Sequence, residues 1–366
     1  ISTGSPAANL FWLSQYEEEN FAKIHKFLIG PDYIAYRLTG KIQTDYCEAS
    51  TSSLCDLKTG TWSEEIRRLF KFPRDIYPEI KGTCEVCGIV TKQWQEKFHF
   101  KQDVKVLTGT GDNPAAAIAT GCFAKGYPVL SLGTSGVLMY PKKKINFEVK
   151  GKNILFSMDG KDVLILVQGV VQSTGSSLAW WVKNTLQADD FMEETTGVDL
   201  KHLGENELMF YPHLVGDKTI YQDPELRGSF VGIGTDTTRK EMTIAVMEGI
   251  AFAVKQLVSV MGVSKEELAR LKVTGGGSKN EVWMQILADV LNTKVEQLES
   301  GAGAGYGIAL CAAAAGDENL SMNDLIEQTV SIKNTFIPRQ YNRELYEQKY
   351  QKYLRVYDAL KHIYQE

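Results

Sequence analysis

The sequence lacks the charge excess and the long apolar run that define several large classes of protein. Its 40 basic and 45 acidic residues leave a net charge of −5, and its pI is about 5.7. A nucleic-acid-binding domain is typically basic, and no apolar run reaches the roughly 20 residues that cross a bilayer. We therefore expect no nucleic-acid partner and no membrane partner.

The beginning of the chain shows no secretory signal. Residues 1–4, Ile-Ser-Thr-Gly, do not contain the basic stretch followed by an apolar stretch that directs secretion. They also lack an initiating methionine, which predicts that upstream residues are missing from this sequence. The expected location is the cytoplasm.

Cysteine is sparse, with six residues at positions 47, 55, 84, 87, 122 and 311. Cys84 and Cys87 form a CxxC motif, but a zinc ribbon requires a second such pair, and the sequence has none. A thioredoxin-like CxxC opens a helix, whereas the following residues 88–90, Gly-Ile-Val, predict a strand. We interpret the cysteines as reduced side chains of a cytosolic protein and predict no metal site.

What the chain does contain is typical of a folded protein of two domains. Its 366 residues are enough for two domains of ordinary size. The 43% apolar and 23% charged fractions are those of a globular protein.

Residues 105–137 contain two short apolar runs that each end in a glycine-rich turn. The first turn, residues 109–111, leads to Asp112, Asn113 and a helix opened by proline. The second turn, residues 133–136, carries two hydroxyl side chains and no charge. Glycine lets a ligand approach the backbone closely, and successive N–H groups with Thr and Ser hydroxyls form a concave anion site. The pattern predicts a phosphate site beside a carboxylate.

Asp112 has two interpretations at this position. It could cap the free N–H groups of the following helix. At a strand end beside a phosphate site, it could instead take the proton from a hydroxyl while fixed donors hold the phosphoryl oxygens. The succession of two glycine turns favours the second interpretation, and the working hypothesis is a kinase that acts on a hydroxyl.

Periodicity and turn residues predict the other elements. Helices are expected over residues 6–28 with a break near 17–20, from Pro31 to Gly40, after the cap Ser63, over 244–261 and from Arg339 onward. Strands are expected at residues 104–107, 129–132, 154–158, 163–167 and 271–274. Residues 44–52 are small and polar and predict a loop that leads to a short buried segment.

Two more glycine positions open helices after strands. Gly175, within residues 173–177, either allows a close approach of the helix or lies near nucleotide phosphates. Residues 275–278, Gly-Gly-Gly-Ser, precede a helix that starts near Asn280 and can hold a nucleotide against its backbone. The turn is neither a Walker A motif nor a dinucleotide fingerprint, which argues against a dehydrogenase.

Several stretches together resemble the FGGY carbohydrate kinases, with spacing closest to the xylulose kinases. The matching stretches are residues 4–13, 31–40, 44–50, 109–113, 131–136 and 228–248. Two departures stand out. The family's usual lysine in the first stretch is Asn9 here, and its Gly-Glu-Arg-Thr loop is Gly-Asp-Lys-Thr at residues 216–219. A lysine cannot reproduce the two-pronged hydrogen bonding of an arginine.

The resemblance implies an α/β protein with the actin-like, ribonuclease-H-like fold, in which two α/β domains enclose ATP in a cleft. Residues 1–121 would be the remaining part of the sugar-binding domain, and residues 122–366 the nucleotide-binding domain with a C-terminal helix. Asp112 would be the general base and Asn113 a sugar contact. The nucleotide contacts would come from Gly133, Thr134, Ser135, Gly175, Gly276 and Asn280. Mg²⁺ would bridge oxygens of ATP.

The resemblance covers the middle and the end of the family pattern, without its first hairpin and Asp-Gly-Thr phosphate loop. The first domain is therefore expected to be incomplete. Because phosphoryl transfer needs donors on both sides, the chain alone is expected to be a poor catalyst or to need a complementing N-terminal fragment; a homodimer is the other partner considered. The implied reaction converts D-xylulose to D-xylulose 5-phosphate. Gluconate, ribulose and glycerol stay open as acceptors, as does a non-catalytic actin-like ATP-binding module.

Overall fold

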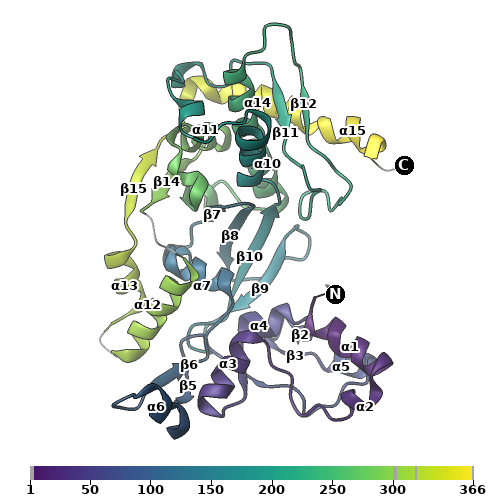
Figure 1. The fold of residues 1–366 in the computed structure, drawn as a ribbon, viewed down its shortest axis with the longest axis vertical. Coiled ribbons are helices and arrows are strands. Elements are labelled where there is room, and N and C mark those ends of the chain that lie inside the picture. Colours follow the sequence, from purple (N-terminus) through teal and green to yellow (C-terminus); the bar gives the residue numbers. More distant parts are fainter. Residues whose placement is uncertain (1–3, 300–302, 318–319, 365–366) are drawn as a thin grey trace.

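The chain is elongated and centres on a seven-stranded sheet (Figure 1). A computed structural model describes residues 4–299, 303–317 and 320–364, without the side chains of 124–125. The strand order is β15-β14-β13-β7-β8-β10-β9. These strands are β7 (Val129–Leu132), β8 (Gly136–Lys142), β9 (Lys152–Phe156), β10 (Leu164–Val171), β13 (Arg270–Thr274), β14 (Lys294–Leu298) and β15 (Ile332–Phe336).

Eight shorter strands form four two-stranded pairs, β1 with β4, β2 with β3, β5 with β6, and β11 with β12. They are β1 (Gln43–Asp45), β2 (Cys55–Asp56), β3 (Thr61–Trp62), β4 (Glu79–Lys81), β5 (Val86–Ile89), β6 (Lys105–Leu107), β11 (Met209–Tyr211) and β12 (Ser229–Val231). The strands predicted in this part and in the large sheet are confirmed to within a few residues.

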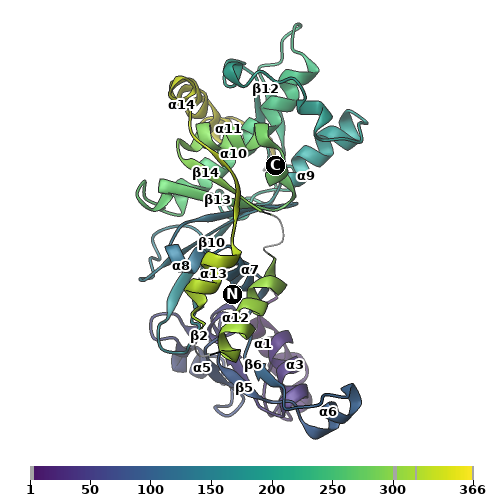
Figure 2. The ribbon, with the colours of Figure 1, turned by 90° about the vertical axis from the view of Figure 1, so that its left-hand side faces the viewer.

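Helices surround the large sheet and form much of the N-terminal end. They are α1 (Pro6–Tyr16), α2 (Glu18–Phe21), α3 (Gly30–Thr39), α4 (Tyr46–Thr51), α5 (Glu64–Leu69), α6 (Lys92–Phe98), α7 (Asp112–Ala119), α8 (Cys122–Lys125), α9 (Gly175–Ala179), α10 (Arg239–Val260), α11 (Glu281–Leu291), α12 (Ala304–Gly316), α13 (Met322–Thr329), α14 (Gln340–Leu354) and α15 (Val356–Tyr364). In Figure 2, α14 lies beside α10 and α11 at one end of the molecule, and α1 and α3 lie at the other end.

The large sheet is covered on both faces because successive strand residues point to opposite sides. Leu130 and Leu138 belong to the core that α10 and α11 complete. Their neighbours Val129 and Met139 pack instead with Ala117 of α7. The sheet therefore separates α10 and α11 from α7.

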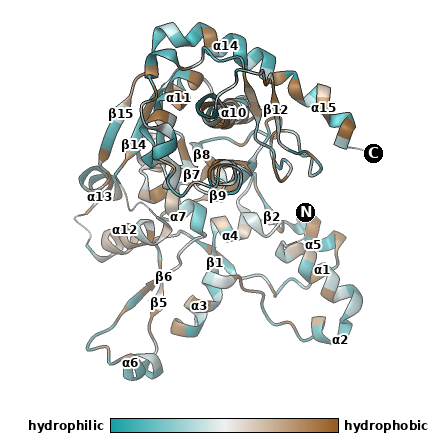
Figure 3. Ribbon diagram, turned by 45° about the horizontal axis from the view of Figure 1, so that its top comes forward, coloured by the Kyte–Doolittle hydropathy of each residue, from teal (hydrophilic) through white to brown (hydrophobic). Residues whose placement is uncertain are grey.

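Helix α10 is the central helix of the main core and is hydrophobic along most of its length (Figure 3). A capping box begins it, in which Thr238 and Glu241 exchange hydrogen bonds of 3.2 and 2.8 Å. By length and hydropathy α10 could cross a membrane, but 72% of its most apolar window is buried inside the protein. Its apolar character is explained by packing, as predicted for this helix.

The N-terminal helices match their predicted limits only in part, because α2 ends at Phe21 and residues 22–28 of the predicted second helix are not helical. Helix α1 ends at Tyr16 and α2 begins at Glu18, which confirms the predicted break, and α3 ends at Gly40 in the left-handed conformation, φ 74°. The predicted loop over residues 44–52 is wrong, because β1 and α4 occupy it. The Asp45 carboxylate accepts a hydrogen bond from the N–H of Glu48 at 2.9 Å and starts α4.

Candidate active site

Three turns of the candidate site meet at one edge of the large sheet. β13 runs parallel to β7, and β8 runs antiparallel to both β7 and β10. The carboxyl ends of β7, β10 and β13 therefore lie at the same edge. The turns at residues 133–136, 172–175 and 275–278 follow these strands directly.

The first two turns are joined by their backbones. The N–H of Gly175 donates to the carbonyl oxygen of Gly133 at 3.0 Å, and the N–H of Ser176 donates to that of Thr134 at 3.0 Å. The Thr174 hydroxyl also donates to the Gly133 oxygen, at 3.1 Å. A Cβ at position 175 would lie 2.3 Å from that oxygen. Only glycine permits this contact, which accounts for its presence.

The side chains of the β7 turn are available to a ligand. Thr134 is exposed and Ser135 is partly exposed. Their hydroxyl groups make no side-chain hydrogen bond within the described part of the chain. The Thr134 carbonyl oxygen accepts from residues 174 and 176, and the Ser135 carbonyl oxygen accepts from the N–H of Gly133. The turn thus presents two hydroxyl donors on a fixed backbone.

The third turn packs against the end of β7. Gly275 has φ 94°, and a Cβ there would lie 2.7 Å from the Leu132 carbonyl oxygen. At Gly276 a Cβ would meet nothing within 4 Å, so this residue faces open space. Asn280 is buried. Its side chain accepts from the N–H of Trp283 and donates to the Thr195 hydroxyl, each at 3.0 Å. The Asn280 amide therefore caps α11, and any nucleotide contact by this side chain would have to share or replace these bonds.

Asp112 is the first residue of α7 and is exposed. Its carboxylate accepts a hydrogen bond from the N–H of Asn113 at 2.7 Å. A Cβ at Gly111 would lie 3.0 Å from the Glu48 carboxylate oxygen Oε1, so glycine at this position lets α4 approach the start of α7. Both interpretations of Asp112 remain compatible with this geometry, because its second carboxylate oxygen is not used by the bond to Asn113.

Helix α7 is fixed by close contacts on two sides. Ala117 packs on the sheet, and Ile118 packs with Cys311 of α12. A Cβ at Gly307 of α12 would lie 1.9 Å from the Ala115 carbonyl oxygen. The two helices therefore touch through their backbones, which holds the helix that carries Asp112.

Three carboxylates that the sequence did not single out lie near the start of α7. Burial raises the pKa of Glu48 to about 7, and the negative charges of Asp45, Asp32 and Asp112 add to this effect. Burial likewise raises the pKa of Asp45 and of Asp32 to about 6 each, against hydrogen bonds that lower it. The sequence predicts only a loop around Asp45 and Glu48. No local sequence pattern indicates that these two residues share a site with Asp112.

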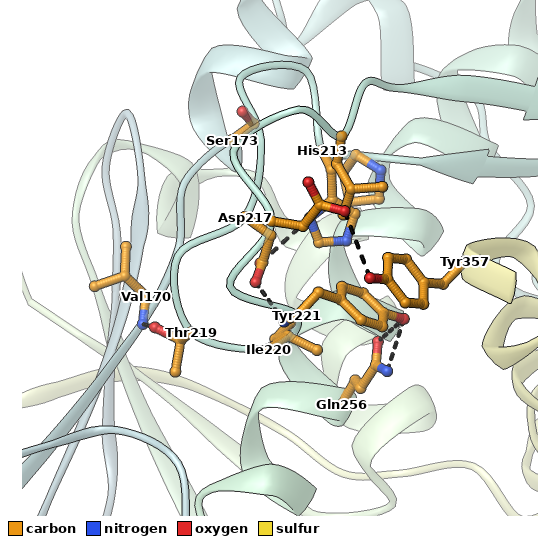
Figure 4. A network of polar contacts seen from close by, with 12 residues as sticks. Val170, Ser173, His213, Asp217, Thr219, Ile220, Tyr221, Gln256 and Tyr357 are labelled. Carbon is orange, nitrogen blue, oxygen red and sulfur yellow. Dashed lines mark hydrogen bonds and ion pairs between the residues drawn. The ribbon is translucent and has the colours of Figure 1, made fainter. Parts of the chain in front are cut away.

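A buried polar network lies beside the end of β10 (Figure 4). The Nδ1 atom of His213 lies 3.3 Å from the Oδ2 atom of Asp217, and both side chains are buried. Burial opposes ionisation of Asp217, but His213 and two backbone N–H groups bind its carboxylate, so its pKa is lowered. Thr219 accepts a hydrogen bond from the N–H of Val170 at 3.0 Å, which fastens this loop to β10. The loop was predicted from the Gly-Asp-Lys-Thr sequence, but the buried pair was not.

Comparison with known proteins identifies the family. The model for the FGGY family of carbohydrate kinases, N-terminal domain, matches residues 1–119, and the model for its C-terminal domain matches residues 129–316. A xylulose kinase from Bacillus subtilis is 30% identical over 364 residues, which is 100% of this chain and 71% of that protein. A xylulose kinase from Lactococcus lactis is 32% identical, covering 97% of this chain and 71% of that protein.

A solved structure of a xylulose kinase from Brucella ovis has the same fold. Its TM-score is 0.87 at 27% identity, and the match covers 98% of this chain and 73% of that one. The expected two-domain α/β fold of the actin-like type is confirmed, and kinases of this kind are phosphotransferases. The chain belongs to the FGGY family of carbohydrate kinases.

Proposed function

We propose that the protein transfers the terminal phosphoryl group of ATP to a hydroxyl of a sugar, and that the sugar is D-xylulose, giving D-xylulose 5-phosphate. The observation that carries the proposal is the meeting of three glycine turns at one sheet edge, two of them hydrogen-bonded to each other. Such an array of N–H groups and hydroxyls suits a polyphosphate. The relatives named xylulose kinase support the choice of sugar.

In the proposed reaction Asp112 acts as the general base. Its exposed carboxylate takes the proton from the sugar hydroxyl as that oxygen attacks the phosphoryl group. Asn113, next along α7, orients the sugar. Because a kinase must keep water from replacing the sugar, the two domains would close over the substrates.

The nucleotide would lie along the sheet edge. Gly133, Thr134 and Ser135 would hold its phosphates, with Gly175 supporting that turn from behind. Gly276 and Asn280 would lie against its adenosine part. The exposed Asp112 carboxylate is an oxygen ligand of the type that Mg²⁺ prefers, so the site suits a Mg²⁺ ion that arrives on ATP. When bound, the ion would neutralise charge on the phosphate oxygens.

We also propose that the N-terminal end of the molecule binds further polypeptide, either a complementing N-terminal fragment or a second copy of the chain. Several large apolar side chains there are between 46% and 59% exposed, among them Tyr33, Ile34, Val86, Ile89 and Phe98. Apolar groups exposed together mark interaction surfaces. Sedimentation of the chain with and without a fragment from the start of a relative would test this. A chain that stays monomeric and does not associate with the fragment would contradict the proposal.

The experiment that tests the proposed reaction measures ADP release from ATP and Mg²⁺ with D-xylulose, ribulose, gluconate and glycerol in turn. We expect turnover to depend on D-xylulose and to fall by about 10²–10⁴-fold in Asp112→Asn. The variant should keep the native melting temperature, because Asp112 is exposed.

The controls separate the alternatives. Turnover with another acceptor would change the sugar but not the reaction. ATP binding without turnover, in the chain alone and with the complementing fragment, would favour a non-catalytic ATP-binding module. Undiminished turnover in Asp112→Asn would refute the assignment of the base.

A further inference from the structure

Two cysteines that are far apart in the sequence meet in the structure. Cys84 lies in the turn between β4 and β5, and Cys311 lies in α12. Cys84 packs against the apolar cluster that contains Cys311, and each thiol changes the pKa of the other. Cys311 is fully buried in a cluster with Ile118 and Phe156, and Cys84 packs against this cluster while remaining partly exposed. One thiol of the pair is therefore reachable and the other is protected.

The two thiols differ in acidity as well as in exposure. A hydrogen bond from the Cys311 thiol stabilises the Cys84 thiolate and lowers the pKa of Cys84, against the opposing effect of burial. The same hydrogen bond, together with burial, raises the pKa of Cys311. Since the thiolate is the reactive form of cysteine, Cys84 is the nucleophile of the pair.

The other cysteines have no such arrangement. Burial is the main influence on the pKa of each, and it raises all of them: Cys47, Cys55, Cys87 and Cys122. The CxxC motif itself does not operate as a pair, because Cys87 contacts the Thr39 hydroxyl at 3.6 Å. The partner of Cys84 comes from the other end of the chain.

Backbone contacts hold the two thiols in place. The N–H groups of Thr83 and Cys84 donate to the carbonyl oxygens of Ser157 and Met158 at 2.8 and 2.9 Å. On the other side, α12 is held against α7 by the close contact of Gly307 with Ala115. Both cysteines therefore lie on backbone that is held in place, and the two thiols can react without the movement of a flexible segment.

We propose that Cys84 and Cys311 are an oxidation site that forms an intramolecular disulfide with a low-molecular-weight disulfide such as oxidised glutathione. The Cys84 thiolate attacks one sulfur of oxidised glutathione, whose disulfide bond breaks and releases one glutathione thiolate. The released thiolate accepts the proton of the Cys311 thiol. The Cys311 sulfur then attacks the Cys84 sulfur and displaces the second glutathione. Two protein thiols are oxidised, and one glutathione disulfide is reduced to two thiols.

The bond would join the two parts of the molecule that the family models distinguish. Cys84 lies within residues 1–119 and Cys311 within residues 129–316. It would close next to α7, since Ile118 of that helix belongs to the same cluster as Cys311. Oxidation would therefore restrain motion between these parts beside Asp112, and the chemistry of the pair does not depend on the proposed sugar substrate.

The test treats the reduced chain with oxidised glutathione and maps its peptides by mass spectrometry without reduction. We expect a cross-linked peptide that contains Cys84 and Cys311 and lacks two hydrogen atoms. Before oxidation, Cys84 should react with iodoacetamide about tenfold faster than each of the other cysteines. A disulfide between Cys84 and Cys87, or no cross-link, would overturn the proposal.

Matched variants identify the order of the steps. Cys311→Ser should accumulate the mixed disulfide of Cys84 with glutathione, because the displacing thiol is absent. Cys84→Ser should leave Cys311 unmodified, since Cys311 is buried. Cys55→Ser, which removes another buried thiol, should form the cross-link as the native chain does. Equal glutathione labelling of Cys84 in the native chain and in Cys311→Ser would overturn the assigned roles.

Discussion

The two sides of the candidate site are held in different ways. At the sheet edge, the turns at residues 133–136 and 172–175 are locked by backbone hydrogen bonds and by a glycine contact that admits no side chain. At the start of α7, Asp112 is exposed, and nearby carboxylates, among them the partly buried Glu48, shape its electrostatic environment. The first side depends on backbone shape, and the second depends on charge.

This difference predicts which changes each side tolerates. A substitution at the sheet edge should act through sterics and should be nearly independent of pH. A substitution near Asp112 should act through ionisation and should show its effect over a limited pH range. The buried His213–Asp217 pair combines both features, because it lies in the loop that Thr219 fastens to β10.

The largest effect is expected from Gly175→Ala. Its new Cβ would lie 2.3 Å from the Gly133 carbonyl oxygen, which is backbone and cannot turn away. We expect a loss of about 3 kcal/mol in the free energy of unfolding, near the upper end of overpacking effects, and a more than tenfold weaker affinity for ATP. Urea unfolding and calorimetric titration with ATP measure the two quantities.

Gly276→Ala is the matched control, because a Cβ there meets nothing within 4 Å. Its free energy of unfolding should change by less than about 0.5 kcal/mol. If Gly175→Ala were as stable as Gly276→Ala and bound ATP normally, the two turns would not be locked as described.

An intermediate effect is expected from Asp217→Asn. The pKa of Asp217 is lowered in the folded protein, so its carboxylate stabilises the fold above the ordinary value of 3.8 and loses this contribution as pH falls through its folded pKa. At pH 7 the variant should be about 1–2 kcal/mol less stable, because an ionic hydrogen-bond acceptor is replaced by a neutral one. Urea unfolding at pH 7 and at pH 3 should show the difference shrinking in acid.

Asp162→Asn serves as the control for that comparison, since Asp162 is exposed. It should match the native chain at both pH values. A difference for Asp217→Asn that stays constant down to pH 3 would mean that the ionised Asp217 carboxylate does not support the loop.

The smallest effect, and the opposite pH trend, is expected from Glu48→Gln. Burial raises the pKa of Glu48 from 4.5 to about 7, so the protonated form is favoured in the folded state. The associated stability is fully present below about pH 4.5 and is lost as pH rises through about 7. At pH 8 the variant should therefore be more stable than the native chain by about 1 kcal/mol, a value reduced for partial exposure, whereas at pH 4 the two should agree.

The same unfolding series with Glu65→Gln is the control, because Glu65 is exposed on α5. No stability gain for Glu48→Gln at pH 8 would show that Glu48 is not held in a desolvated environment. A gain of equal size at both pH values would assign the effect to packing instead of ionisation.

Local sequence was sufficient for most elements and for the glycine turns. The strand ends at Leu132 and Thr274, the helix cap at Asn280 and the glycine stop of α3 at Gly40 follow from turn chemistry and apolar periodicity over a few residues. The predicted loop over residues 44–52 failed because its polar residues serve a helix cap and buried contacts, as shown by the bond from the N–H of Leu155 to the Ser50 hydroxyl at 3.0 Å.

The sequence by itself determined the family, the order of the elements and the positions where only glycine fits, because these depend on short-range geometry. The tertiary structure alone decided that Gly175 touches Gly133, that Glu48 lies beside Asp112, that His213 pairs with Asp217 and that Cys84 meets Cys311. Three of these contacts join segments far apart in the chain, and the His213–Asp217 pair lies within one loop but is buried by the packing around it. Burial is a property of the packed molecule, and the order of residues along the chain does not reveal it.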